Sequence, residues 1–555
     1  MNYSRIASLA LLTLLCSCSP TKKLEKKTDS QTLENLKSHI QYLADDKLEG
    51  RRTGSEGEKL AMEYIGNQFK EIGLLPKGPT SYFQSFVVDD GKKIKPGTQL
   101  SINGNTLTPE TDFFPFPYSP NQSLEALPAV AVQESDMPWF VDLKETLEEN
   151  KDNPRFDINE YIRTNSKKAK ERGASAIFYY NSSGIEDNLK YEPKDKTDDS
   201  SIPVIYISKK IAEKYFSDKS ATINIKMKTV IGKSTRIGHN VIGYIDNNAA
   251  STIVLGAHYD HLGYGEDGGS LDPAKTKSIH NGADDNASGT AALIELARKL
   301  KGSNSKKDNY LFIAFSGEEL GLFGSKHFTE NPTIDLKTVD CMINMDMVGR
   351  LNDSSKVVTV GGYGTSPTWG LLFNNVNDPH IFNNRLVFRF DSTGTGPSDH
   401  TSFYRKDIPV LFYFTGIHSD YHKPSDDADK INYRGEEAVV DHIFNLVLNL
   451  GNREKLVFTK TRETQMSTGS RPGVSLGIMP DYTFSGSGVR ADGISEGKAA
   501  QKAGLKAGDV IIQLGDLPIS SLENYMKALG TFKKGDKTKV KIKRGNETLE
   551  VPVEF

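Results

Sequence analysis

The sequence predicts an α/β protein whose main domain is a mostly parallel β-sheet with helices on both faces. A β-rich insert and a small C-terminal domain accompany it. Four apolar runs alternate with helical or loop segments after residue 236: 251–257, 309–315, 341–345 and 408–414. Such alternation is typical of parallel strands covered on both faces. A chain of 555 residues is also too long for one core and indicates about three to four domains.

The remaining segments follow from local pattern and composition. Residues 32–75 are predicted to form two helices around a Gly-rich loop, with Ser55 as N-cap of the second, because apolar residues recur there at spacings of three and four. We assign the catalytic domain to 32–125 and 233–455 and an inserted, non-catalytic β-rich module to 126–232. Residues 456–472 lose periodicity and are expected to form a linker before a compact domain over 473–555.

The overall charge gives no reason to expect a nucleic-acid partner. The chain has 69 Lys and Arg against 72 Asp and Glu, a formal net charge of −3, and shows no strongly basic field. Beyond the extreme N-terminus, no apolar run has the length needed to span a bilayer.

The N-terminus is predicted to be an export signal. Arg5 precedes an apolar stretch over 6–15, which has the length of a signal peptide rather than of a transmembrane helix. The next residues, "LCSC", resemble a bacterial lipobox. This resemblance implies cleavage before Cys18, lipid on its thiol and a membrane-anchored protein of the bacterial cell envelope. The alternative is an ordinary secretory peptide cut nearby.

Lipidation would leave residues 1–17 as the signal peptide and 18–31 as a solvated tether. With Cys16 removed and Cys18 acylated, Cys341 is the last of the three cysteines. No structural disulfide is therefore expected, despite an oxidising compartment.

Histidine and acidic residues follow each of the four predicted strands. In chain order they are His258 and Asp260, Glu318 and Glu319, Asp346, and Tyr421 and His422, with a further pair, Asp284 and Asp285, before a predicted helix. Each alone has an ordinary explanation, since a His after a strand is more often structural and paired Glu residues usually start a solvated helix. In an open α/β sheet, however, functional groups gather at the carboxyl ends of the strands. The repetition predicts a common site.

The residue types indicate a metal. Two His with three or more carboxylates and no Cys suit zinc or another borderline divalent ion. The carboxylates are too many for one tetrahedral ion, so two ions sharing a bridging carboxylate are expected. Two-metal sites about 3.5–4 Å apart activate a water and stabilise the resulting oxyanion.

Five strings carry a family resemblance: "GAHYDH", "NGADDNASG", "FSGEELGLFGS", "NMDMVG" and "YHKPSDD". They closely resemble the motifs of the co-catalytic dizinc exopeptidases, which include aminopeptidase S, aminopeptidase Y and glutamate carboxypeptidase. The resemblance covers about residues 34–75 and 236–450. It implies two zinc ions per catalytic domain and hydrolysis of N-terminal residues from peptide substrates.

The resemblance also implies a role for each matching residue. His258 and Asp346 are expected on one ion, Glu319 and His422 on the other, with Asp285 bridging. Asp260 matches the carboxylate that orients the ligand imidazole, and Glu318 the general base. Tyr421 matches a phenol that helps bind the oxyanion in some members. His261 is expected to make hydrogen bonds within its turn, and Asp399 and His400 to line the pocket or support the ligands.

Two accessory modules also resemble known domains. Residues 160–181, followed by "IPVIYIS", are similar to the protease-associated (PA) domain, whose expected role is substrate gating or partner contact. The C-terminal segment strongly resembles a PDZ domain. Leu476, Gly477 and Ile478 match its carboxylate-binding loop, which implies capture of peptide C-termini. The alternative is a lid or spacer that binds no peptide.

Other functions remain open. A non-catalytic receptor or scaffold of the same fold would have lost Glu318 or a ligand, and none is missing. A carboxypeptidase would need Arg residues to recognise a substrate carboxylate, for which Arg350, Arg385 and Arg389 are available. Glutaminyl cyclisation is a further related activity.

Overall fold

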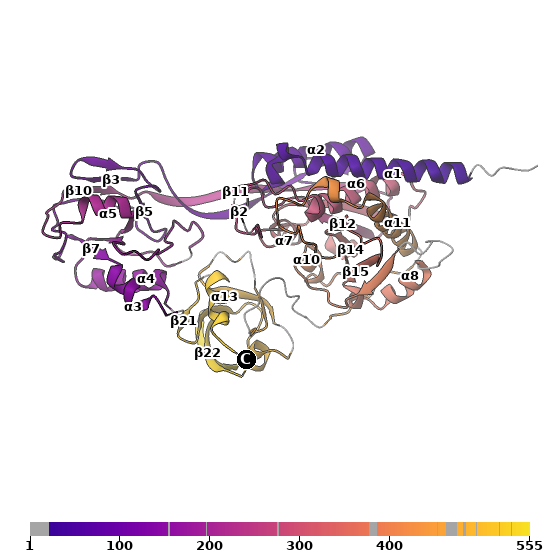
Figure 1. Cartoon of the computed structure of the whole chain (residues 1–555). Helices are drawn as coiled ribbons and strands as arrows, with labels where there is room; N and C mark the ends of the chain where they lie inside the picture. Colours follow the sequence, from indigo (N-terminus) through magenta and orange to yellow (C-terminus); the bar gives the residue numbers. More distant parts are fainter. Residues whose placement is uncertain are drawn as a thin grey trace, which may run out of the picture.

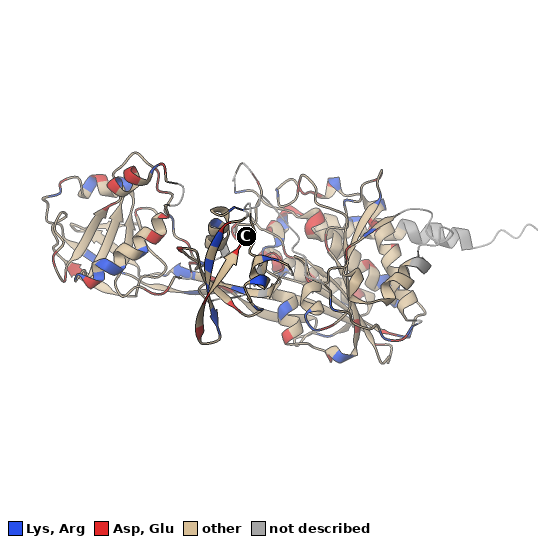
Figure 2. Cartoon of the chain, turned by 90° about the horizontal axis from the view of Figure 1, so that it is seen from below, with Lys and Arg blue, Asp and Glu red and all other residues tan. Residues whose placement is uncertain are grey.

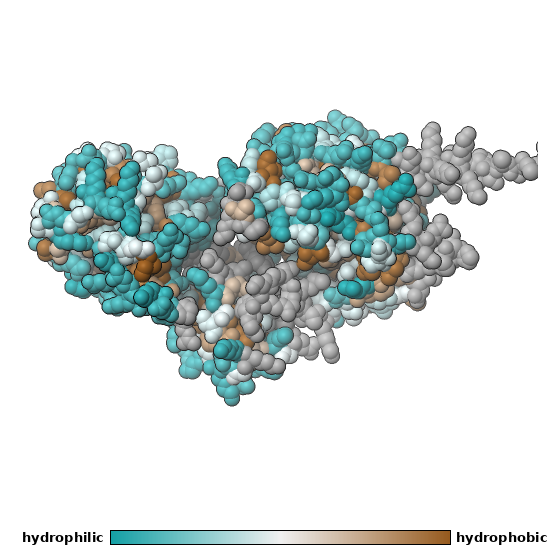
Figure 3. Space-filling model, in the orientation of Figure 1, coloured by the Kyte–Doolittle hydropathy of each residue, from teal (hydrophilic) through white to brown (hydrophobic). Residues whose placement is uncertain are grey.

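The computed structural model describes residues 21–153, 156–195, 197–272, 274, 277–376, 386–451, 453–461, 474–480, 484, 486–494, 497–520, 522–533 and 535–555. Figure 1 shows three bodies: a main domain, an insert reached through a long two-stranded ribbon, and a C-terminal domain. Basic and acidic residues are interspersed over all three in the view of Figure 2. On the face seen in Figure 3, hydrophobic residues are scattered among hydrophilic ones.

The bounds of the elements are as follows. The main-domain helices are α1 (Thr21–Leu43), α2 (Glu56–Ile72), α6 (Gly289–Gly302), α7 (Phe323–Glu330), α8 (Thr368–Val376), α10 (His400–Tyr404) and α11 (Tyr433–Leu450). Its short helical turns are η1 (Asp46–Arg51), η2 (Ala283–Ser288), η3 (Leu336–Thr338), η4 (Tyr363–Thr365) and η5 (Ala428–Lys430). Its strands are β1 (Leu75–Pro76), β2 (Phe83–Ile94), β11 (Ile231–Ile245), β12 (Thr252–His258), β13 (Asn309–Phe315), β14 (Val339–Met345), β15 (Val357–Gly361), β16 (Val387–Phe390) and β17 (Val410–Phe414).

The main domain is built on a nine-stranded mixed sheet. Its order is β1-β11-β13-β12-β14-β17-β15-β16, with β2 paired to β11. The four predicted strands are β12, β13, β14 and β17, and they lie side by side in the order β13-β12-β14-β17, all parallel. The carboxyl ends of these four strands therefore meet at one edge of the sheet. The α/β fold class predicted from the sequence is confirmed.

Helices cover both faces of this sheet. Along β12, Ile253 and Leu255 pack into a core shared with α1, α2, α6 and α11. Val254, between them, packs into a second core with Phe328 of α7 and Phe403 of α10. Alternation of this kind follows from the two-residue repeat of a strand. It makes β12 apolar throughout, which is why its sequence is an unbroken apolar run.

Helix α2 begins and ends where local chemistry requires. Ser55 is its N-cap, and the Ser55 side chain accepts a 3.2 Å hydrogen bond from the backbone N–H of Glu58. Glu58 in turn accepts from the backbone N–H of Gly54 at 3.0 Å, so two donors at the helix start are satisfied. Gly73 closes the helix in a left-handed conformation, with φ 82°. The predicted N-cap is confirmed.

Helix α1 begins earlier than predicted. It runs from Thr21, so part of the stretch expected to be a solvated tether is helical. The segment is rich in Lys and Glu, and such residues have good helix propensity.

The insert also starts earlier than the predicted residue 126. It contains two four-stranded sheets, β4-β3-β10-β6 and β5-β9-β8-β7. Its elements are β3 (Gln99–Ile102), β4 (Asn105–Leu107), β5 (Phe113–Pro115), β6 (Ser123–Ala126), β7 (Pro138–Asp142), α3 (Lys144–Asn150), α4 (Ile158–Glu171), β8 (Ala176–Tyr180), β9 (Val204–Ile207), α5 (Lys209–Tyr215) and β10 (Ile225–Lys228). Strand β3 pairs with β10, more than a hundred residues later in the chain. A pairing this distant leaves no local signal in the sequence.

Strands β2 and β11 join the insert to the main domain. They pair antiparallel from Phe83 and Val241 at one end to Ile94 and Ile231 at the other. Figure 1 shows this ribbon leaving the main domain toward the insert. The same strand β11 pairs with β13 inside the central sheet.

The described residues of the C-terminal domain form an antiparallel sheet accompanied by short helices. Its elements are β18 (Ile478–Pro480), β19 (Val489–Ile494), α12 (Ala499–Lys502), β20 (Val510–Leu514), β21 (Leu517–Pro518), α13 (Leu522–Gly530), β22 (Lys537–Arg544) and β23 (Glu547–Glu554). Leu476 and Ile478 are buried in its core. Gly477 between them has φ 85°, a conformation that favours glycine. The Leu476 carbonyl accepts a 2.7 Å hydrogen bond from the N–H of Ala500.

In the described part of the chain, no helix combines the length and apolar character required to cross a bilayer. Cys341 is a buried free thiol. Cys18 lies outside the described residues.

Candidate metal centre

The predicted site residues converge at the carboxyl edge of the central sheet. His258 is the last residue of β12, Asp346 follows β14 directly, and Glu318 and Glu319 follow β13. Since β12 lies between β13 and β14, the three strand ends are neighbours. Asp285 comes from η2 in front of α6, where the Asp285–Asn286 peptide bond is cis. His422 comes from the loop after β17.

These side chains form two groups of possible metal donors. In the first group, Nε2 of His258 lies 3.3 Å from Oδ1 of Asp346 and 3.4 Å from Oδ1 of Asp285. In the second group, Nε2 of His422 lies 3.2 Å from Oδ2 of Asp285 and 3.3 Å from Oε2 of Glu319. Asp285 belongs to both groups and turns a different oxygen toward each.

The spacing fits zinc. Donors around a tetrahedral zinc ion with bonds of about 2.0–2.1 Å lie about 3.3–3.4 Å apart, and the distances in both groups are 3.2–3.4 Å. All five donors are largely shielded from water: the exposed fraction is 1% for the His258 side chain, 5% for Asp285 and 15% for His422. Carboxylates gathered this closely repel one another unless cations compensate them, which a pair of divalent ions would do.

A hydrogen bond orients each imidazole. Nδ1 of His258 lies 3.2 Å from the carbonyl oxygen of Asp260 and 3.7 Å from its carboxylate. Nδ1 of His422 lies 2.9 Å from the carbonyl oxygen of Gly269. Because a carbonyl only accepts hydrogen bonds, each Nδ1 is the donor, and a neutral imidazole held in this way would offer the lone pair of its Nε2 to a metal.

The carboxylates are supported as well. Ser398 donates a 2.7 Å hydrogen bond to Oδ2 of Asp346, and its hydroxyl accepts from the side-chain amide of Asn344 at 2.8 Å. Asp260 accepts from the hydroxyl of Thr53 at 2.9 Å and from the backbone N–H of Glu318 at 3.2 Å. Sequence reasoning did not single out Thr53 or Ser398, although both lie within the ranges 34–75 and 236–450 that the resemblance covers.

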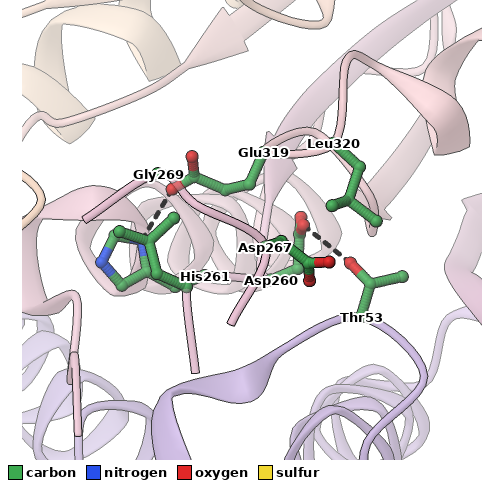
Figure 4. A pocket seen from close by; sticks show the side chains of 8 residues that line it. Thr53, Asp260, His261, Asp267, Gly269, Glu319 and Leu320 are labelled. Carbon is green, nitrogen blue, oxygen red and sulfur yellow. Dashed lines mark hydrogen bonds and ion pairs between the residues drawn. The ribbon is translucent and has the colours of Figure 1, made fainter. Parts of the chain in front are cut away.

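His261 does more than stabilise its own turn. Its Nδ1 lies 2.7 Å from Oε1 of Glu319 and 4.0 Å from Oδ2 of Asp285. The shorter distance is that of a hydrogen bond and is less than the spacing between donors on one zinc ion. His261 therefore holds the Glu319 carboxylate from the side opposite Oε2. Figure 4 shows this pair, and the Thr53–Asp260 pair, on the wall of one small pocket.

Asp284 does not join the donor groups. Its carboxylate accepts from the backbone N–H of Gly349 at 2.7 Å and from Ser288 at 3.0 Å, and lies 3.2 Å from Nε2 of His418. The side chain of Asp426 accepts hydrogen bonds from the backbone N–H groups of Asp284 and Asp285, at 3.0 and 3.1 Å. Asp426 thereby fixes the turn that carries Asp285.

The pKa values of the neighbours Glu318 and Glu319 are shifted in opposite directions. Burial raises the pKa of Glu318 well above its usual range, with nearby Asp346 and Glu319 adding to the rise. Burial also acts to raise the pKa of Glu319, but His422 and His261 outweigh it and hold that pKa well below the usual range. Carboxylates whose environments separate their pKa values in this way are suited to different tasks.

The other predicted residues border this centre. The Tyr421 ring stacks on the His422 ring with centroids 3.9 Å apart. Burial and the charges of Asp285 and Glu319 raise the Tyr421 pKa, so its phenol stays protonated. Asp399 is fully buried, and burial raises its pKa to about 7. The His400 ring stacks on Phe412 at 4.6 Å.

Part of the sequence matches known families. Residues 240–447 match the profile of peptidase family M28, and residues 471–555 match that of the PDZ domain. The chain is 28% identical over 330 residues to aminopeptidase YwaD of Bacillus subtilis, which covers 56% of this chain and 64% of that protein. It is 30% identical over 186 residues to a probable leucine aminopeptidase of Arthroderma otae, which covers 31% of this chain and 45% of the relative. The chain thus spans less than two thirds of the length of these curated relatives.

Solved structures resemble the chain more loosely. An aminopeptidase from Aneurinibacillus sp. strain AM-1 has a TM-score of 0.42 at 22% identity, covering 79% of this chain and 98% of that one. BSAP, a zinc aminopeptidase from Bacillus subtilis, has a TM-score of 0.43 at 21% identity, covering 75% and 95%. Residues 240–447 are thus similar to peptidase family M28, and residues 471–555 are similar to the PDZ domain.

Proposed function

We propose that the chain is a zinc-dependent aminopeptidase that releases N-terminal residues from peptides at a centre of two zinc ions. The observation that carries this proposal is the double role of Asp285. Its Oδ1 lies 3.4 Å from Nε2 of His258 and its Oδ2 lies 3.2 Å from Nε2 of His422. One carboxylate placed between two separate donor groups is suited to bridging two ions.

Five residues would hold the metals. His258 and Asp346 would bind one ion, Glu319 and His422 the other, and Asp285 both. When bound, two zinc ions supply Lewis acidity that activates water and stabilises the charge developing on the scissile carbonyl. A non-catalytic receptor of this fold is not favoured, because all five donors and Glu318 are present.

Glu318 is the proposed general base. Its carboxylate reaches the edge of the first donor group, with Oε2 4.0 Å from Nε2 of His258. There it can accept a proton from the attacking water and pass one to the leaving amine. Asp260 orients His258, and the protonated phenol of Tyr421 is suited to donate a hydrogen bond to the oxyanion.

The arginines support an aminopeptidase over a carboxypeptidase. Arg350 lies 3.2 Å from the carboxylate of Asp420 and 3.9 Å from that of Asp426, so its charge is already compensated. Arg389 lies on the exposed strand β16. Arg385 lies outside the described residues. The relatives named as aminopeptidases favour the same polarity.

The test is a panel of amino-acid arylamides beside N-blocked peptides with a free C-terminus, assayed with and without a chelator. Hydrolysis of the free-amine compounds only, lost on chelation and restored by zinc, is expected. Hydrolysis of blocked peptides from the C-terminus would instead show carboxypeptidase activity. Cyclisation of N-terminal glutamine without peptide-bond hydrolysis would instead show glutaminyl cyclase activity.

The N-terminus, the insert and the C-terminal domain also have proposed roles. Cys18 would carry the lipid that anchors the protein in the bacterial cell envelope. The insert would act as a PA-like module that gates substrates or contacts partners. The PDZ domain would capture peptide C-termini at the loop formed by Leu476, Gly477 and Ile478.

A further inference from the structure

The loop that follows the carboxyl end of β12 holds His422. This loop, residues 262–272, makes two hydrogen bonds to that residue. The Gly269 carbonyl lies 2.9 Å from Nδ1 of His422, and the Leu271 N–H donates to the His422 carbonyl at 2.9 Å. Both the ring orientation and the backbone of His422 therefore depend on where the 262–272 loop lies.

An ion-pair cluster centred on Asp267 anchors this loop. Its carboxylate lies 2.7 Å from Nε of Arg52, 3.0 Å from a terminal nitrogen of Arg236 and 3.1 Å from Nζ of Lys194. The Asp267 side chain is only 13% exposed, so water screens these charges poorly. Asp90 also faces the two arginines, with its carboxylate 3.0 Å from Nε of Arg236.

The three cations come from three distant parts of the chain. Arg52 lies between η1 and α2, and Arg236 lies on β11 in the ribbon. Lys194 belongs to the insert, in a segment that folds back along the ribbon. The Pro193 carbonyl accepts a 2.7 Å hydrogen bond from the N–H of Lys92, and the hydroxyl of Tyr191 donates to the Lys92 carbonyl at 2.9 Å. These two hydrogen bonds to Lys92 place the neighbouring Lys194 beside Asp267.

The cluster borders the metal centre directly. Figure 4 shows Asp267 and Gly269 in the same pocket as Glu319 and His261. Arg236 also donates a 2.6 Å hydrogen bond to the Thr53 carbonyl. Without the negative charge of Asp267, Arg52 and Arg236 would face each other with less compensation and the loop would lose its anchor.

We propose that Asp267 is a positioning residue for His422, and that the insert reaches the metal centre through the Lys194–Asp267 ion pair. The inference rests on the proposed function, because it assigns His422 to the second zinc ion. It adds that the affinity of this ion depends on the anchored 262–272 loop and, in part, on the insert.

The experiment measures both zinc affinities of the full chain by competition with a chromophoric chelator, together with kcat and KM. In Asp267→Asn, the affinity of one zinc ion is expected to fall about tenfold, the lower end for loss of a group supporting a metal ligand. The other affinity stays within about twofold, because no hydrogen bond between described residues joins His258 or Asp346 to the loop. Lys194→Met should weaken the same ion about two- to fivefold, as for a partly exposed ion pair.

Two sets of controls identify the cause. Glu266→Gln removes a neighbouring charge that lies 3.7 Å from Arg52 and is 40% exposed, and it should leave both affinities unchanged. Asp267→Glu keeps the charge and should restore part of the loss. Added to His422→Ala, Asp267→Asn should cause no further loss, whereas added to Asp346→Asn its effect should be additive.

The inference is overturned if Asp267→Asn binds both ions as the wild type does, or weakens both equally. If Asp267→Asn does not fold, the test relies on Lys194→Met, which changes an exposed side chain. Unchanged zinc affinities in Lys194→Met would overturn the proposed link between the insert and the metal centre. The proposed function has a separate signature. A wild-type chain that binds no zinc or hydrolyses no arylamide would refute that function before any variant is compared.

Discussion

Thr53 donates a 2.9 Å hydrogen bond to Oδ2 of Asp260, so the segment between η1 and α2 reaches the residue that orients His258. Both side chains are fully or almost fully buried, with Thr53 1% and Asp260 0% exposed. The other oxygen, Oδ1, accepts from the backbone N–H of Glu318 at 3.2 Å. The carboxylate is therefore held from two sides, and one of its supports also positions the proposed base.

Replacing Thr53 by Val tests this support. The shape is kept, but Oδ2 of a buried carboxylate loses its donor, which typically costs about 1–3 kcal/mol. Loss of a group that orients a metal ligand typically lowers activity about 10–100-fold, and we expect kcat/KM for an arylamide to fall within that range. Thr53→Ser keeps the hydroxyl and should be nearly normal. Equal effects of Val and Ser would rule out the hydrogen bond as the cause.

The neighbours Glu318 and Glu319 should respond differently to substitution. Glu318→Gln keeps shape and removes the base, so zinc stoichiometry should stay near that of the wild type while kcat falls about 10²- to 10⁴-fold. Glu319→Ala removes a ligand and should lose zinc together with activity. The measurement is zinc content beside kcat for both variants. Normal turnover of Glu318→Gln, or metal loss as severe as in Glu319→Ala, would contradict the assignment.

Arg51 should be a major source of stability in the main domain. It is fully buried and donates hydrogen bonds to the backbone carbonyls of Leu43, Tyr259, Asn281 and Gly282. Burial lowers the pKa of its guanidinium to about 10, which leaves it charged at neutral pH. Arg51→Met leaves these carbonyls without donors and should lower the free energy of unfolding by about 3–5 kcal/mol. The exposed Arg434 of α11 gives the control: in urea unfolding, Arg434→Met should match the wild type.

His442 should make the main domain less stable in acid. Its ring packs against Phe388 and Phe373, at 4.4 and 5.4 Å between centroids, and lies 3.2 Å from the hydroxyl of Tyr413. Burial lowers the His442 pKa to about 3. As the pH falls below about 6.5, His442 therefore becomes protonated in the unfolded chain but stays neutral in the folded chain. The stability contributed by neutral His442 is complete above that pH and is lost as the pH falls toward 3.

The matching variant is His442→Phe. Each pH unit in this window costs about 1.4 kcal/mol per proton. Between pH 6.5 and 4.5 the wild type should lose about 2–3 kcal/mol more of its unfolding free energy than His442→Phe does. The measurement is chemical unfolding at several pH values. Parallel curves for the two proteins would show that His442 takes no part in the acid sensitivity.

Cys18→Ser tests the proposed anchor. A single acyl chain binds a membrane only marginally, whereas a lipoprotein carries several, so the wild type should sediment with membranes and the variant should not. Fractionation of cells expressing each protein, followed by immunodetection, gives the answer. If Cys18→Ser sediments as fully as the wild type, the lipid anchor is wrong.

The sequence predicted the strands, and the residues that come just beyond them, because both depend on local pattern. The apolar runs became β12, β13, β14 and β17, and the residues just beyond them meet at one edge of the sheet. Neighbouring parallel strands have their carboxyl ends at the same edge of the sheet, whatever the details of packing. For the same reason Ser55 could be assigned as an N-cap from its neighbours alone.

What the sequence could not predict depends on contacts between distant segments. Strand β3 pairs with β10 of the insert, and no periodicity within residues 99–102 indicates this pairing. The hydrogen bond from His261 to Glu319 joins residues fifty-eight positions apart. Asp267 is surrounded in sequence by Gly and acidic residues typical of an exposed loop, and only the fold brings Arg52, Arg236 and Lys194 to it.

The ribbon of β2 and β11 also determines how the insert is joined to the central sheet. The chain leaves through Ile94 and returns through Ile231, and these two residues are partners in the same ladder. A tight turn joining them would convert the ribbon into an ordinary β-hairpin, with the register of the central sheet unchanged. The insert thus occupies the position of the hairpin loop. Replacing the insert by such a turn would leave every strand of the central sheet in place, and it would remove Lys194 from the carboxylate of Asp267.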